Sequence, residues 1–128
     1  MVTLTEGRHT GEFILTEANG KRSRDNVTVT FTAAGNLAAG LVMGVITASG
    51  KWKPHEDGAS DGSEVAAGIL YDNVTAAAAS DVVAVMITRD AEAKRGALEW
   101  DATVSTPTLE NAAIDDLATA GIVVRDGE

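Results

Sequence analysis

The sequence predicts a small β-rich α+β domain with one C-terminal helix, preceded by an extended N-terminal arm. Short apolar segments bounded by turn residues fill the middle of the chain, the apolar period becomes helical near the C-terminus, and a last apolar segment follows. Because strands and helices do not alternate as in βαβ units, we expect an α+β fold rich in strands. For 128 residues we expect one compact sheet or barrel-like body, residues 26–128, and an arm, residues 1–25.

The arm is polar and contains one apolar run, Phe13-Ile14-Leu15, and the sequence Ala18-Asn19-Gly20 that follows predicts a turn. Its charges sum to zero, so the whole net charge of −9 lies in the body. Two interpretations of the apolar run stay open. The run packs on its own domain, or it adds a strand to the edge of a partner's sheet.

The body begins with a segment of period two, residues 27–32, in which apolar residues alternate with threonine. This pattern predicts a half-buried strand. Continuous apolar runs predict more deeply buried strands, and Gly44 inside the first of them indicates a bulge or a close approach of another segment. These runs are residues 41–47, 65–71 and 82–88, with a short further strand at 98–100.

The period changes after Thr106, which is a candidate N-cap followed by a proline at the first helical position. An apolar stripe then recurs every four residues, at Leu109, Ala113 and Leu117. Gly121 is placed to end the helix, and residues 122–124 predict a closing strand.

Composition excludes several function classes. The absence of cysteine rules out disulfides, zinc thiolates and cysteine nucleophiles. The net charge of −9 argues against nucleic-acid binding, and residues 21–24 form the only basic cluster. No apolar stretch approaches the roughly 20 residues of a membrane span, and the polar start gives no sign of a secretory signal. We expect a soluble protein made in a cytoplasm.

No motif indicates catalysis or a cofactor. Residues 58–62 spell a hydrolase nucleophile elbow, but a predicted strand follows and no histidine comes later in the chain, so we interpret them as a turn. The acidic stretch 57–64 does not match a calcium loop. His9 and His55 are expected at the surface, without metal-ligand spacing. The sequence therefore predicts no enzyme, metal or cofactor.

Four stretches resemble the head decoration proteins of lambda-type tailed bacteriophages. The strongest is the acidic Asp-Gly turn running into a Gly-Ile-Leu strand, residues 57–70, and the others are residues 6–20, 22–29 and 117–124. The similarity covers nearly the whole chain. The arm departs from the lambda protein, since it is longer and carries Glu-Phe-Ile-Leu-Thr and Arg-Ser-Arg-Asp segments.

The resemblance implies a structural virion protein that is made in the bacterial cytoplasm. Such proteins sit as homotrimers on the outside of the expanded capsid, at local three-fold positions, and reinforce it against DNA pressure. The implied partners are other copies and the major capsid protein, with no nucleic acid, membrane, small-molecule substrate or cofactor. The candidate capsid-binding residues of the arm are Glu12, Phe13, Ile14, Leu15, Thr16, Arg22 and Arg24.

Two alternatives remain beside this interpretation. One is another phage structural or adhesin module, and the other is a small β-rich ligand-binding protein.

An alanine-rich core with few aromatic side chains buries little area per residue, at roughly 25 cal/mol per Å². Association between copies would therefore add to the stability of the fold.

Overall fold

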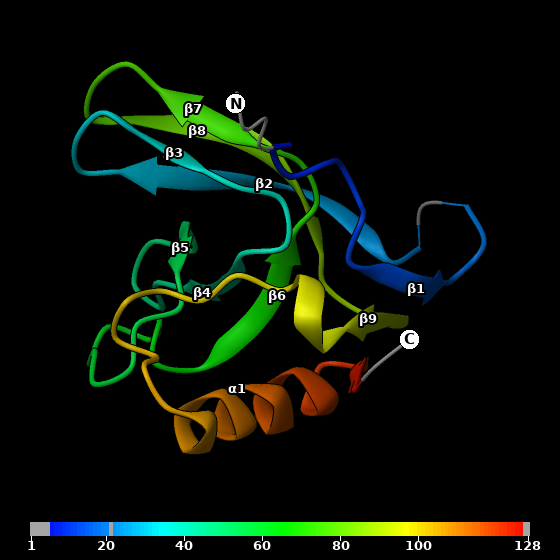
Figure 1. The fold of residues 1–128 in the computed structure, drawn as a ribbon. Coiled ribbons are helices and arrows are strands. Elements are labelled where there is room, and N and C mark those ends of the chain that lie inside the picture. Colours follow the sequence, from blue (N-terminus) through cyan, green and yellow to red (C-terminus); the bar gives the residue numbers. More distant parts are fainter. Residues whose placement is uncertain (1–5, 21, 127–128) are drawn as a thin grey trace, which may run out of the picture.

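The computed structural model describes residues 6–20 and 22–126, and its organising feature is a closed five-stranded barrel of order β2-β5-β4-β6-β8 (Figure 1). One α-helix, α1 (Pro107–Thr119), and a 3-10 turn (Arg95–Ala97) complete the described elements. The strands are β1 (Ile14–Glu17), β2 (Arg24–Phe31), β3 (Gly35–Leu37), β4 (Val42–Val45), β5 (Trp52–Pro54), β6 (Ala66–Leu70), β7 (Val74–Ala76), β8 (Ser80–Ile87), β9 (Ala91–Lys94) and β10 (Ile122–Arg125).

The longest ladder of the barrel joins β2 to β8, antiparallel, from Arg24 opposite Ile87 to Phe31 opposite Ser80. The period-two pattern of β2 turns Val29 and Phe31 into the barrel, where both are buried. The ladder between β4 and β6 has a bulge at Gly44. A Cβ at Gly44 would lie 2.7 Å from the carbonyl oxygen of Ser63, so this close approach requires glycine.

The barrel closes weakly between β2 and β5, where Val29 and Trp52 form the one paired position. Beyond that pair the two strands separate. A separate two-stranded sheet joins β3 to β7. Because β3 follows β2 and β7 precedes β8 in the chain, this sheet lies beyond the Phe31 end of the β2–β8 ladder. The result is a barrel with one open side near the ends of β2 and β5.

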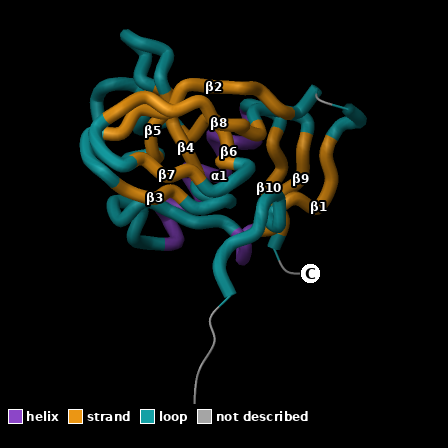
Figure 2. The backbone as a smooth tube through the Cα atoms, turned by 90° about the horizontal axis from the view of Figure 1, so that it is seen from above, coloured by secondary structure: helices purple, strands orange, loops and turns teal. Residues whose placement is uncertain are grey.

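A second sheet of order β1-β9-β10 stands beside the barrel, and Figure 2 shows its strands at the end of the molecule away from β3 and β7. Helix α1 packs next to β10 and β6. Its buried side chains, Ala113 and Leu117, join a core with Phe13, Ile69 and Ile122. A second core, containing Val29 and Met43, fills the barrel.

The structure confirms the β-rich fold class and the principal elements. The strands predicted at 27–32, 41–47, 65–71 and 82–88 are β2, β4, β6 and β8, and the closing strand is β10. Thr106 caps α1, since its hydroxyl oxygen accepts from the backbone N–H of Leu109 at 3.3 Å. Gly121 follows the helix with a φ of 93°.

One predicted strand, residues 98–100, is wrong. Glu99 forms only an isolated bridge with Leu41, because the 3-10 turn immediately before it redirects the chain. Five strands were missing from the expectation: β1, β3, β5, β7 and β9. These have only three or four residues, which is too short to show an apolar period.

Candidate functional site

The candidate site is the outer edge of the sheet β1-β9-β10, where β1 has one neighbouring strand. The backbone N–H of Lys94 donates to the carbonyl oxygen of Phe13 at 2.8 Å, and that of Ala18 donates to Asp90 at 3.0 Å. These bonds fasten both ends of β1 to the segment around β9. The other edge of β1 carries no described strand, and Figure 2 shows β1 as the last strand of its sheet. An unpaired edge can accept a strand from a partner.

The apolar run of the N-terminal segment is divided between the core and the surface. Phe13 is 1% exposed and belongs to the core under α1, and Ile14 packs against the same core. Leu15 is 39% exposed. A bulge between Ile14 and Thr16 explains the division, because it interrupts the alternation that would place Phe13 and Leu15 on one face. Phe13 and Ile14 therefore pack on their own domain, whereas the side chain of Leu15 is exposed.

Two further candidates, Glu12 and Thr16, also lie at the surface. The hydroxyl of Thr16 donates to Glu92 on β9 at 2.7 Å, and Arg125 on β10 pairs with the same carboxylate. The Thr16 hydrogen bond and the Arg125 pair together lower the pKa of Glu92. Glu12 lies 3.4 Å from Arg8. The outer face of this sheet is thus a row of paired polar groups with Leu15 beside it.

The candidates Arg22 and Arg24 lie where the chain passes from β1 into β2. Arg24 pairs with Glu17, and its guanidinium carbon lies 4.2 Å from the centre of the Tyr71 ring. The hydrogen bond from Arg24, with a second from Ser23, lowers the pKa of Glu17. Arg22 is exposed, with its Nε 3.2 Å from Asp90.

Sequence reasoning missed the residues that position this segment. Ser23 is fully buried and donates to Glu17 at 2.6 Å. Asp25 at the start of β2 pairs with Arg89, which lowers the pKa of Asp25. These partners lie up to 64 positions apart, so no local pattern reveals them. Of the expected arm, residues 1–5 and Lys21 lie outside the described residues.

The expectation that both histidines lie at the surface is half wrong. His9 is exposed, with Nε2 2.6 Å from Glu6. His55 is 4% exposed, and its Nδ1 lies 2.9 Å from the carbonyl oxygen of Ser63, which accepts the hydrogen bond. The loop 57–62 brings Ser63 back beside His55, and the backbone N–H of Glu56 donates to the same carbonyl oxygen at 3.2 Å. That loop is the expected turn, with positive φ at Gly58 and Gly62.

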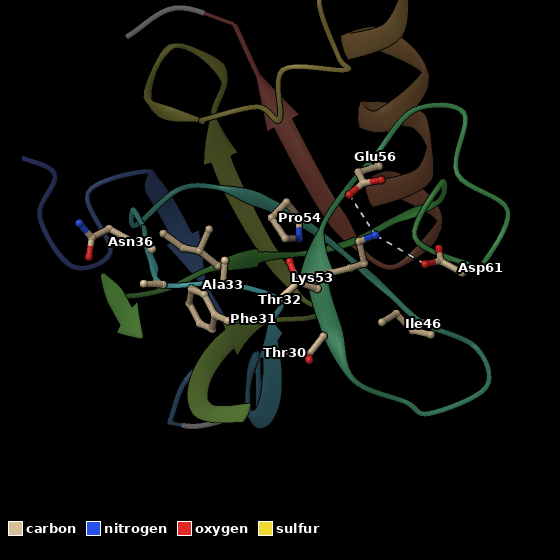
Figure 3. A pocket seen from close by; sticks show the side chains of 13 residues that line it. Thr30, Phe31, Thr32, Ala33, Asn36, Ile46, Lys53, Pro54, Glu56 and Asp61 are labelled. Carbon is tan, nitrogen blue, oxygen red and sulfur yellow. Dashed lines mark ion pairs between the residues drawn. The ribbon is translucent and has the colours of Figure 1, made fainter. Parts of the chain in front are cut away.

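An open groove of about 470 Å³ lies on the side of the barrel where β2 and β5 separate (Figure 3). Phe31 and Pro54 line its apolar part. At its other end Lys53 lies 3.0 Å from Glu56 and 3.5 Å from Asp61. The Glu56 hydrogen bond raises the pKa of Lys53. The lysine is thus already neutralised by its own chain.

The described residues offer little else for chemistry. Over residues 6–20 and 22–126, no three His, Asp or Glu side chains gather in a way that would hold a metal ion. Within the same part of the chain, α1 is too short and too polar to cross a bilayer. The candidate surface for recognition is therefore the β1 edge with Leu15, Thr16 and Glu12.

Comparison with known proteins identifies the family. The family model of the bacteriophage lambda head decoration protein D matches residues 3–122, which includes the N-terminal segment, the barrel, α1 and the first residue of β10. No curated protein sequence matches the chain. Because the match spans nearly all of the chain, the protein belongs to the bacteriophage lambda head decoration protein family, a family of structural capsid proteins.

Proposed function

We propose that the protein decorates the outside of the expanded phage head as homotrimers at local three-fold positions and stabilises the head against the pressure of packaged DNA. Family membership supports the role in capsid decoration. The partner that we propose is the major capsid protein, which the N-terminal segment contacts by strand addition. The single observation that carries this contact is the unpaired outer edge of β1, with Leu15 exposed beside it.

The proposed contact divides the work among the seven candidate residues. Phe13 and Ile14 hold β1 on the body, whereas Glu12, Leu15 and Thr16 face outward toward the capsid strand. Arg24 fixes the start of β2 through Glu17, and the exposed Arg22 would exchange its ion pair with Asp90 for an acidic group of the capsid surface. Direct capsid contact by Phe13 would require β1 to leave the body.

A preformed strand lowers the entropic cost of this contact. Ordering a flexible segment costs roughly 1–2 kcal/mol per residue of backbone. The four residues of β1 are already ordered against β9 in the isolated chain. Three such strands in one trimer then act with an effective concentration that raises avidity by about 10²–10⁴. Selective binding to the expanded shell stabilises that shell by linkage.

Co-sedimentation tests this function directly. Purified protein is mixed with expanded heads and with unexpanded proheads, and the pelleted fraction is measured over a range of concentrations. Saturable binding to expanded heads alone, with a raised temperature of head disruption, is the expected result. Failure to bind heads of the cognate phage in either state would reject the proposal.

A further inference from the structure

The distribution of charge along the chain leaves two long uncharged segments. Residues 26–50 contain no Asp, Glu, Lys, Arg or His, although 23% of the chain is charged. Residues 73–80 are also free of charge. The net charge of −9 is therefore concentrated in the remaining sequence.

The fold brings parts of both segments together at one end of the molecule. Phe31 pairs with Ser80 and Gly35 with Ala76, so the β2–β3 and β7–β8 connections lie side by side. Figures 1 and 2 both place them at the end away from β1 and β9. We call residues 32–36 and 77–80 the uncharged end. All nine of these residues are exposed, and most of them are alanine, threonine or glycine.

The groove of about 470 Å³ adjoins this end, since residues 32–36 form part of its lining. Its apolar wall includes Phe31, Leu37 and Ile46, and Figure 3 shows Ala33 among the side chains around it. Strand β3 pairs only with β7 among the described residues, and its three residues, Gly35–Leu37, line the groove. The groove thus combines apolar side chains with an unpaired strand edge.

We infer that a second copy of this chain occupies the groove, and that residues 77–79 at the tip of one copy seat in the groove of the next. This inference rests on the proposed homotrimer and identifies its contact surface. A groove on one copy and a tip on another make a heterologous contact, and three such contacts around a three-fold axis close a ring. The occupant has small uncharged side chains, which match the apolar and uncharged part of the groove.

Electrostatics favours a second copy over other occupants. Two molecules of net charge −9 repel each other, so they approach most easily through surfaces that carry no charge. Charged residues are also depleted in the cores of protein interfaces, because burying an unpaired charge is costly. A charged small molecule is a poor occupant, because Lys53 is already paired with Glu56 and Asp61.

The arrangement also agrees with the proposed capsid contact. If the uncharged ends meet at the three-fold axis, the β1 edges lie at the opposite end of each copy and point away from that axis. Each of the three N-terminal segments then faces a different place on the shell. Self-association and capsid binding therefore use separate surfaces, and each can be removed without the other.

Sedimentation equilibrium of the free protein tests the inference. The variants are Ala33→Glu in the groove lining and Ala78→Glu at the tip, and the matched control is Ala112→Glu on the exposed face of α1. All three add one negative charge at an exposed alanine, and thermal melting checks that each remains folded. Wild type and Ala112→Glu are expected to form trimers at high concentration. Ala33→Glu and Ala78→Glu should raise the dissociation constant at least about tenfold.

Salt gives an independent readout of the same contact. Because the interface is uncharged and the copies repel, added salt should strengthen association of the wild type. A wild type that stays monomeric at its highest soluble concentration, or an equal loss in Ala112→Glu, would overturn the inference. Weaker association at higher salt would also overturn it. Binding to heads is measured separately, so trimers that ignore heads would reject the proposed function and leave this contact standing.

Discussion

The hydrogen bond from the Lys94 amide to the Phe13 carbonyl, at 2.8 Å, joins the N-terminal segment to β9 across 81 positions of sequence. Phe13 also places its side chain in the core with Leu117 of α1 and Ile122 of β10. The first strand of the chain is therefore part of the folded body. Removal of the first twenty residues would take away a core side chain as well as the proposed capsid contact.

Replacement of Phe13 by alanine should destabilise the protein by about 3–5 kcal/mol, because it leaves a cavity in a packed core. The side chain is 1% exposed. Urea unfolding followed by circular dichroism measures the change, with Leu15→Ala as the control. Since Leu15 is 39% exposed, its truncation should cost about 1 kcal/mol or less. Similar losses in the two variants would contradict the burial of Phe13.

Replacement of Leu15 by aspartate should weaken binding to expanded heads while leaving the fold intact. The substitution places a charge beside the edge at which the capsid strand is proposed to pair. Val123→Asp is the matched control, because Val123 is 42% exposed and lies on β10, at the other edge of the same sheet. Affinity from co-sedimentation should fall at least about tenfold for Leu15→Asp, which is 1.4 kcal/mol, and little for Val123→Asp. A larger loss with Val123→Asp would move the contact to β10.

Loss of the cap at the N-terminus of α1 should lower the free energy of unfolding of the protein. Thr106→Ala removes the acceptor of the Leu109 amide and should cost about 1 kcal/mol. Thr108→Ala, an exposed threonine inside the first turn of α1, is the control and should change stability by less than about 0.5 kcal/mol. Denaturant midpoints of the three proteins compare the two positions. If Thr108→Ala proves the more damaging, the capping role of Thr106 is wrong.

Acid should destabilise the N-terminal region through Glu17. The Arg24 hydrogen bond lowers the pKa of Glu17 below its ordinary value of 4.5, so the folded state binds this proton less readily than the unfolded state. The contribution is present above pH 4.5 and is lost as pH falls through the lowered pKa. Glu17→Gln should therefore show a shallower loss of stability between neutral and acid pH. Unfolding curves at several pH values measure this slope, and an unchanged slope would show that the pair is not linked to folding.

The longer strands and the helix were predictable because they carry strong periodicity. Local sequence alone indicates one structure at several places. These are the alternation in β2, the apolar runs of β6 and β8, and the cap at Thr106. The short strands were not predictable for the opposite reason. Strand β9 has the sequence Ala-Glu-Ala-Lys, which is equally compatible with a helix. Only its pairing with β1 and β10 makes it a strand.

The sequence indicated the segment of the candidate site but not which of its side chains are buried and which are exposed. The apolar run at residues 13–15 identified the segment, yet strict alternation places Phe13 and Leu15 on the same face. The bulge between Ile14 and Thr16 separates them, and it depends on the register with β9. The partners of Arg24 and Asp25 likewise depend on tertiary contacts that no spacing reveals.

An electron cryomicroscopy reconstruction of expanded heads incubated with the protein tests the central claim most directly. We predict density for three bodies around each occupied local three-fold axis on the outer surface, with a strand of the capsid protein beside the free edge of β1. Bound bodies that contact the shell through another surface, with the β1 edge facing solvent, would contradict the account, as would heads that carry no added density.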